Sequence, residues 1–167
     1  MKIRKEINED SEKIFALNAS AFPSEVEARL VDRLRETATP FVSLLAEEDG
    51  EIKGHILFTP VTLDSAPELS MLGLAPMAVA PQFQNSGIGS RLVEAGLEEC
   101  RKLDTQAVIV LGHPDYYPRF GFVPSVNYGI KSEYDVPDEV FLVRELIPGS
   151  LSHKPGIVSY HPAFARI

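Results

Sequence analysis

The sequence predicts a mixed α/β (α+β) fold, in which a central sheet has antiparallel strands at its N-terminal side, a βαβ unit in the middle and helices on both faces. Asp49-Gly50 lies between two apolar runs and is a strong hairpin signal, because both residues tolerate positive φ. A helical pattern over 87–103 separates two strand-like runs, 69–80 and 106–112. This order predicts a right-handed crossover between parallel strands.

The N-terminal quarter predicts one strand followed by two helices. Residues 2–7 (KIRKEI) alternate as an edge or first strand does. Asn8 to Asp10 are expected to cap a first helix. Ser24 and Glu27 form a capping-box pattern that predicts the start of a second helix. The residues expected on the buried sides of these helices are Ile14, Phe15 and Leu17 in the first, and Val26, Leu30, Val31 and Leu34 in the second.

The rest of the chain predicts further strands around one long helix. The run 41–63 is expected to form the two strands of the hairpin, and the strand over 69–80 contains Pro76. Because proline cannot donate to a ladder, Pro76 marks an edge, a bulge or a parting of neighbours. The runs 139–146 and 156–164 are expected to be the last strands of a single domain, residues 1–167. The helix over 87–103 should bury Ile88, Leu92, Val93, Gly96, Leu97, Cys100 and Leu103.

Composition narrows the class of protein. The chain has 167 residues, 44% of them hydrophobic, and a net charge of −8, which argues against nucleic acid and anionic membranes as partners. Its start has no apolar signal core and no run approaches the roughly 20 apolar residues of a membrane span, so we expect a cytoplasmic protein. The single cysteine, Cys100, is expected to be a core residue. His55, His153 and His161 have no metal-ligand spacing, and no metal is expected.

The stretch QFQNSGIG, residues 82–89, joins a strand to the long helix. A helix that begins near Gly87 has unpartnered N–H groups and about half a positive charge at its start, which favours phosphate. Gln84, Asn85 and Ser86 could add side-chain donors, and Arg91 could add charge. The alternative is that the glycines only permit a tight turn. The spacing excludes the P-loop and dinucleotide fingerprints.

Two motifs carry a resemblance to a known family. VAPQFQNSGIGSRLV resembles the acyl-CoA-binding segment of the GNAT family of N-acetyltransferases, [QR]-x-x-G-x-[GA], here Gln84, Gly87 and Gly89. About thirty residues later, YYPRFGF resembles that family's Y-x-x-x-G-F, with Tyr117 as its tyrosine. The segment is also similar to that of a bacterial subgroup of predicted N-acetyltransferases. The resemblance implies a GNAT-like acyl-CoA acyltransferase fold over nearly the whole chain.

The resemblance further implies a cosubstrate and a reaction. Acetyl-CoA would give its acetyl group by direct transfer to a primary amine of a small molecule or peptide, without a metal. The pantetheine arm would lie where the strand over 69–80 parts from its parallel neighbour. Val79 would polarise the thioester carbonyl through its amide. The residues implied in cofactor binding are Met77, Ala78, Val79, Gln84, Asn85, Ser86, Gly87, Ile88, Gly89 and Ser90.

Acid and base differ in how well the sequence defines them. Tyr117 is the expected general acid, because a phenol with a pKa near 10 is protonated at neutral pH. Its alternative role is packing among phenylalanines, and Tyr116 is the competing acid if the loop is shifted by one residue. The base is left open between Glu68, His113 and a water molecule.

The chain departs from the family pattern at two places. Asn85 and Ser86 stand where many relatives have a glycine and a basic residue, and apolar residues and Gly112 stand where many have an asparagine.

The acceptor is expected near the turn 21–24, the loop 111–117 and the last strands, and the net charge mildly favours a cationic amine. A homodimer is left open. The competing functions are a noncatalytic acyl-CoA-binding or CoA-sensing module and a structural domain without a ligand.

Overall fold

The computed structural model describes residues 1–166, which form a nine-stranded mixed sheet and three α-helices. The sheet order is β1-β2-β3-β4-β5-β8-β6, while β9 pairs with both β3 and β7. The strands are β1 (Lys2–Lys5), β2 (Val42–Glu48), β3 (Glu51–Leu63), β4 (Met71–Val79), β5 (Ala107–Leu111), β6 (Val123–Pro124), β7 (Ile130–Ser132), β8 (Phe141–Glu145) and β9 (Gly156–Ser159). The helices are α1 (Ser11–Ala21), α2 (Val26–Thr37) and α3 (Ile88–Lys102).

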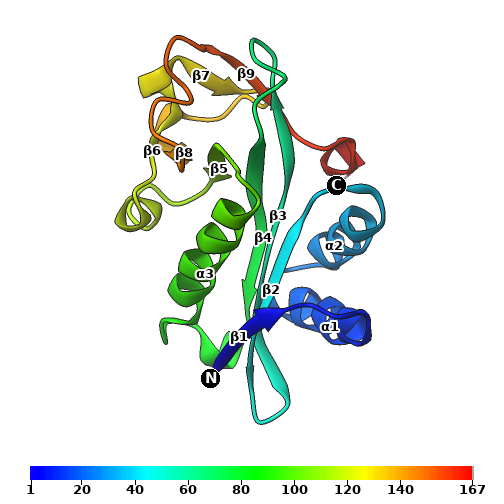
Figure 1. Cartoon of the computed structure of the whole chain (residues 1–167). Helices are drawn as coiled ribbons and strands as arrows, with labels where there is room; N and C mark the ends of the chain where they lie inside the picture. Colours follow the sequence, from blue (N-terminus) through cyan, green and yellow to red (C-terminus); the bar gives the residue numbers. More distant parts are fainter. Residues whose placement is uncertain (167) are drawn as a thin grey trace.

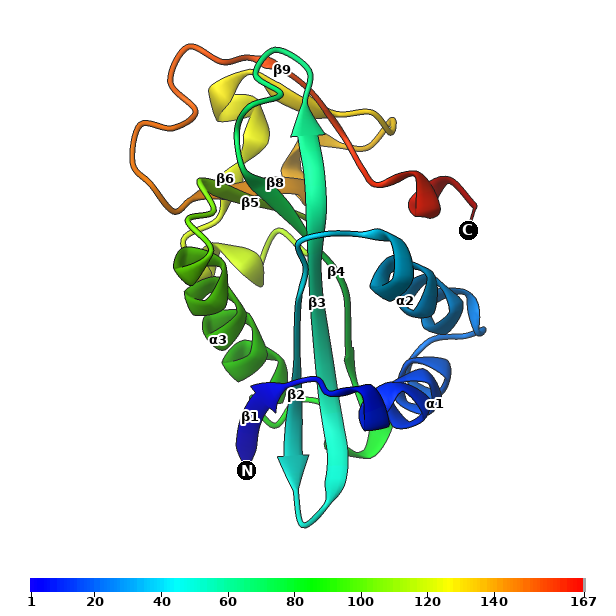
Figure 2. The ribbon, with the colours of Figure 1, turned by 45° about the vertical axis from the view of Figure 1, so that its right-hand side comes forward.

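The predicted architecture is confirmed. The first four strands pair antiparallel, with the β2–β3 hairpin turning at Asp49-Gly50, and β4 pairs parallel with β5 across the α3 crossover. Helix α3 covers one face of the sheet, and α1 and α2 cover the other (Figure 1; Figure 2). The short strands β6 and β7 were not predicted, because two or three residues are too few to show a strand pattern.

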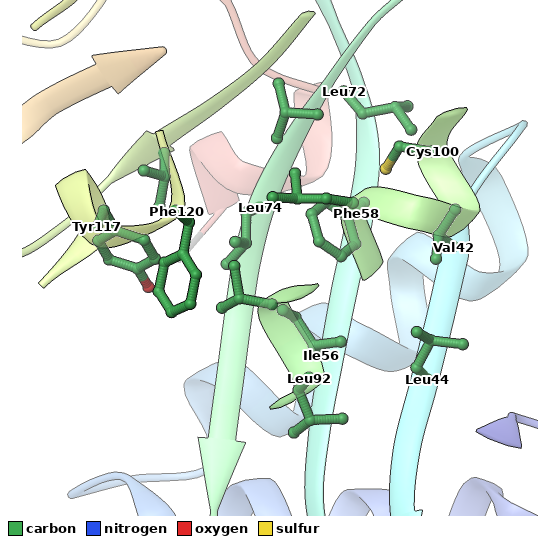
Figure 3. Packing of buried hydrophobic residues seen from close by; sticks show 14 of the residues in the cluster. Val42, Leu44, Ile56, Phe58, Leu72, Leu74, Leu92, Cys100, Tyr117 and Phe120 are labelled. Atoms are coloured by element: carbon green, nitrogen blue, oxygen red, sulfur yellow. The ribbon is translucent and has the colours of Figure 1, made fainter. Parts of the chain in front are cut away.

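The core under α3 depends on a close approach of the helix to the sheet. Phe58 of β3 is fully buried there, beside Leu72 and Leu74 of β4 (Figure 3). A Cβ atom on Gly96 would collide with the Phe58 ring, so glycine sets the distance between α3 and β3. Cys100 is buried in the same cluster, as predicted, and burial raises the pKa of its thiol to about 12.

The first predicted helix cap is right in position and wrong in detail. Asn8–Asp10 form a separate 3-10 turn, and Asp10 is the N-cap residue of α1, which begins at Ser11, but its side chain makes no capping hydrogen bond to that helix. The Asp10 carboxylate accepts hydrogen bonds from the Ile7 N–H at 2.8 Å and from the Arg4 guanidinium at 2.8 and 2.9 Å. The Arg4 guanidinium lowers the pKa of this carboxyl group. Asp10 therefore fixes the end of β1 to the start of α1 through charge.

The capping box predicted for the second helix is also wrong. Helix α2 begins at Val26 after the N-cap residue Glu25, and Ser24 Oγ accepts only the Val26 N–H, at 3.3 Å. The helix therefore starts too late for Ser24 and Glu27 to cap it reciprocally. Leu103, which was expected to be buried, is 45% exposed because α3 has ended and Leu103 is its C-cap residue.

Strands β4 and β5 part halfway along β4. Their parallel pairing covers only Met71–Leu74 and Ala107–Val110, after which β4 continues to Val79 along β3 alone. The β3–β4 register shifts between Ile56 and Phe58, at the level of Pro76. Of the alternatives predicted for this proline, a bulge and a parting of neighbours are both present. The outer edge of the second half of β4 is thereby open.

A buried polar network lies on the face of the sheet that α1 and α2 cover. His55 of β3 is 0% exposed, its Nε2 lies 2.8 Å from Ser43 Oγ, and its Nδ1 lies 3.5 Å from Asn18 Nδ2. Ser43 donates to the Glu6 carboxylate, which also pairs with Arg35. The network joins α1, α2, β2 and β3. Burial lowers the pKa of His55 to about 3, and repulsion from the Arg35 charge adds to this effect.

This histidine makes stability depend on pH. An unfolded histidine has a pKa of about 6.5. As the pH is lowered from about 6.5 towards 3, His55 is protonated in the unfolded chain but stays neutral in the folded one. The free energy of unfolding therefore decreases as the pH is lowered through this range. We expect His55→Gln to have a smaller slope over this window in urea denaturation at several pH values. His113→Gln, a change of an exposed histidine, should keep the wild-type slope. Equal slopes in both variants would contradict the prediction.

Candidate active site

The edge of β4 that β5 leaves open carries a backbone donor. The Ala80 N–H donates to the Lys53 carbonyl of β3 at 2.9 Å. Successive N–H groups of an extended strand point to opposite edges, so the Val79 N–H is directed away from β3 and into the fork between β4 and β5. Gln84 Nε2 donates to the Val79 carbonyl at 3.2 Å. This bond holds the following loop against the end of β4.

The start of α3 faces the same fork. Its N-cap residue, Gly87, has a left-handed backbone (φ 88°, ψ 1°), which suits glycine. No side chain of residues 1–166 caps this helix, and the Arg91 N–H is the first to bond within it, to the Gly87 carbonyl at 3.2 Å. The N–H groups of Ile88, Gly89 and Ser90 precede any intrahelical acceptor. Unpartnered N–H groups at a helix start, together with the helix dipole, favour an anion at such a position.

These two features open into one cleft of about 570 Å³. Most of the residues predicted to bind the cofactor line it. Ala78 does not, because its side chain is 2% exposed and packs on the α1 side of the sheet. Ser86 does not either, since its hydroxyl donates to the Phe83 carbonyl within the loop. The lining residues are Met77, Val79, Phe83, Gln84, Asn85, Gly87, Ile88, Gly89, Ser90, Tyr116 and Arg119.

The two neighbouring tyrosines occupy different places. Tyr116 lines the cleft, and its hydroxyl lies 3.0 Å from Ser90 Oγ in the first turn of α3. Tyr117 is 8% exposed and lies beside Phe120 (Figure 3). Its ring meets the Tyr116 ring edge to face at 5.0 Å. Burial is the main cause that raises the pKa of Tyr117 to about 12. A Cβ atom on Gly112 would collide with the Tyr117 ring, which explains why glycine follows β5 here.

Besides Phe83, Arg119 is a lining residue that sequence reasoning missed. Its guanidinium lies 4.5 Å from the centroid of the Tyr116 ring, and its Nε donates to the Tyr116 carbonyl at 2.8 Å. Arg91, the expected source of positive charge, is exposed on α3 and is not among the lining residues. The available signal was the position of Arg119 inside the second motif, YYPRFGF.

The candidate bases are placed very differently. Glu68 lies in the turn before β4 and is exposed. The six residue-to-residue steps from Met71 to Met77 span about 20 Å of strand, so Glu68 is at the wrong end of β4 to serve the cleft. His113 is exposed in the loop after β5, and its carbonyl accepts the Tyr116 and Tyr117 N–H groups at 3.2 and 3.4 Å. Within the described residues, no group of three His, Cys, Asp or Glu side chains is arranged to hold a metal ion.

Comparison with known proteins identifies the family. The sequence profile of the Acetyltransferase (GNAT) family matches residues 8–122. The chain belongs to this family. Over 167 residues it is 34% identical to the uncharacterized N-acetyltransferase YhbS of Escherichia coli strain K12, covering 99% of each protein. It is also 41% identical to YjhQ, an uncharacterized N-acetyltransferase of the same strain, over 78% of this chain and 74% of that protein. The enzyme class is therefore that of the acyltransferases.

Solved structures agree with the family assignment. The crystal structure of YhbS from Escherichia coli in complex with CoA superimposes with a TM-score of 0.92 at 34% identity, covering 99% of this GNAT chain and 92% of the other. A GNAT family acetyltransferase from Brucella melitensis in complex with acetyl-CoA gives a TM-score of 0.80 at 33% identity, covering 98% of this chain and 97% of the other.

None of the helices within residues 1–166 has the length and apolarity to cross a bilayer.

The conformation of the loop predicts an effect of substitution at Gly87. A Cβ atom at this position would meet nothing within 4 Å, so the effect of a side chain comes from the backbone alone. We expect Gly87→Ala to lower the free energy of unfolding by about 1–2 kcal/mol, because an L-residue is strained at this φ. Gly87→Asn should lower it less, since asparagine tolerates the left-handed region. Urea denaturation would check both, and equal losses would contradict the backbone explanation.

Proposed function

We propose that this GNAT chain, as a single domain, transfers the acetyl group of acetyl-CoA to a primary amine of a small molecule or peptide. The observation that carries the proposal is the cleft that joins the uncapped start of α3 to the Val79 amide at the strand fork. The relatives from Escherichia coli and Brucella melitensis, crystallised with CoA and acetyl-CoA, support the same ligand here.

The cleft fits the two chemically different parts of acetyl-CoA. Its diphosphate would accept hydrogen bonds from the N–H groups of Ile88, Gly89 and Ser90, where the helix dipole favours an anion. The space beside Gly87 is open, which lets a phosphate approach the main chain closely. The pantetheine arm would lie along the open edge of β4 beside Met77 and Val79, which supply backbone groups to its amides.

The reaction follows from the groups at the fork. The amine nitrogen attacks the thioester carbonyl carbon, and the Val79 N–H donates to the oxygen that gains negative charge; such a donor lowers a barrier by about 3–4 kcal/mol. As the C–N bond forms, the C–S bond breaks and the sulfur takes a proton from the Tyr117 hydroxyl. A base removes a proton from the amine, for which we keep His113 and a water molecule as candidates.

Tyr117 suits the role of acid better than Tyr116. Its ring packs on Gly112, two residues after Val110, the last residue of β5 that pairs with β4. Tyr117 therefore lies next to the fork, behind the cleft lining, whereas Tyr116 lines the cleft and its hydroxyl lies at the start of α3 beside Ser90. Tyr117 is protonated at neutral pH, as an acid requires, while burial raises its pKa and so makes it a weaker proton donor than a free phenol.

Cofactor binding is expected to raise the melting temperature. At a hundred times its dissociation constant, acetyl-CoA should stabilise the protein by about 2.7 kcal/mol. For a domain of this size the melting temperature should rise by roughly 5–10 °C. Gly89→Val should lose the shift, because even a Cβ atom there would lie 3.2 Å from the Tyr116 hydroxyl and the valine methyl groups would extend into the cleft. No shift in the wild type would favour a structural domain without a ligand.

Turnover is expected to depend on the Tyr117 hydroxyl. We expect Tyr117→Phe to reduce thiol release by about a hundredfold or more, the usual contribution of a general acid, while its acetyl-CoA-induced melting shift is unchanged. Tyr116→Phe is the matched control and should retain most of the turnover. The assay would measure free CoA with polyamines, amino acids, aminoglycosides and peptide N-termini. Full activity of Tyr117→Phe would reject this acid, and binding without turnover by the wild type would favour the noncatalytic module.

A further inference from the structure

The cleft contains little positive side-chain charge. Among its lining residues, all within residues 1–166, Arg119 is the only charged one. The loop and the first turn of α3 supply neutral donors from Gln84, Asn85 and Ser90. The diphosphate of CoA brings two negative charges, so neutral donors alone leave much of that charge uncompensated. Arg119 is the residue placed to supply the missing charge.

Arg119 is held in place before any ligand binds. Its Nε donates to the Tyr116 carbonyl at 2.8 Å, its Nη2 donates to the Asp115 carbonyl at 3.4 Å, and its guanidinium lies over the Tyr116 ring. A side chain that is already ordered loses less entropy when it binds a ligand. An arginine has five N–H donors, and these two bonds leave the rest of the fork available.

The same contacts place this charge close to the start of α3. The guanidinium lies over the face of the Tyr116 ring, 4.5 Å from its centroid, and the hydroxyl at the edge of the same ring lies 3.0 Å from Ser90 Oγ. Arg119 and the N–H groups of Gly89 and Ser90 thus meet in the same cleft, joined through Tyr116. An anion bound by those N–H groups would lie close to the guanidinium.

We propose that Arg119 is a cofactor-binding residue of this enzyme and pairs with the diphosphate of CoA. The inference rests on the proposed function and adds a ligand contact from outside the glycine loop, thirty-five residues after Gln84. Arginine suits this contact because it stays charged and its planar fork matches two phosphate oxygens. Asn85 and Ser86 can then be neutral without loss of the positive charge that the cofactor needs.

The test compares cofactor affinities by isothermal titration of the full chain. Arg119→Gln should weaken CoA binding by about ten- to a hundredfold, the range for hydrogen bonds to charged groups. Arg119→Lys should recover part of the loss, because it keeps the charge without the fork. Arg91→Gln is the matched control: it removes one positive charge from the first turn of α3, outside the cleft lining, and should change affinity much less. Melting temperatures without ligand would verify that each variant folds.

A second ligand identifies the phosphate. Arg119→Gln should weaken binding of 3′-dephospho-CoA by the same factor as CoA, because both retain the diphosphate. A loss that disappears with 3′-dephospho-CoA would overturn the assignment in favour of the 3′-phosphate. Wild-type affinity of Arg119→Gln, or an equal loss in Arg91→Gln, would overturn the role of Arg119 while leaving the proposed function intact. Failure of the wild type to bind CoA would overturn both.

Discussion

The active-site architecture depends on one break in backbone pairing, the parting of β4 from β5 after Leu74. Up to that residue β4 is bonded on both edges, and beyond it β3 alone holds the strand. Open edges are normally a liability, because unpaired N–H and C=O groups invite other strands. Here the open edge lies inside a cleft between α3 and the segment after β5, where a second chain cannot easily pair with it. The strand therefore lacks ladder hydrogen bonds only in the cleft, where a bound ligand can replace them. The β3–β4 irregularity at Pro76 lies at the same level, so the bulge and the fork form one feature.

A strand held from one side needs support to keep its geometry, and the opposite face of the sheet provides it. Ala78 and Ala80 pack on α1 through Leu17, while the His55 network binds β3 to β2 and to both N-terminal helices. His55 is the direct pairing partner of Ala78. A buried polar network with few alternative arrangements specifies its position more sharply than apolar contacts do. The backbone opposite the Val79 amide is therefore anchored by groups that never touch the cleft. The donor proposed at Val79 would act through its fixed position, so a rigid support behind the strand serves the proposed chemistry.

Much of this arrangement could be predicted from local patterns, and the failures have physical causes. The hairpin, the crossover and the glycine loop depend on short-range signals: Asp49-Gly50, the α3 stripe, and Gly87 with its positive φ. The capping box at Ser24 failed because the turn between α1 and α2 is set by packing of its neighbours on β4, which no four-residue window contains. Arg119 was missed for the same reason. Its relevance arises only when the segment 116–120 folds back on α3, a contact between parts of the chain almost thirty residues apart. Local sequence patterns thus identify single helices, strands and turns, whereas a binding site depends on which of these come together in the fold.

The segment after β5 shows how one short turn can serve both ends of the cleft. Tyr116 precedes a 3-10 turn that begins at Tyr117, and successive side chains of such a turn point about 120° apart. The Tyr116 hydroxyl therefore reaches Ser90 at the start of α3, while the Tyr117 ring turns back onto Gly112 at the end of β5. Arg119, two residues further, returns to lie over Tyr116. A shift of one residue would exchange the tyrosines and separate the guanidinium from the helix start. The close packing of Tyr117 against Gly112 requires glycine there, since a Cβ atom would collide with the ring. Gly112, which is not among the residues that line the cleft, thus makes room for the residue proposed to donate the proton.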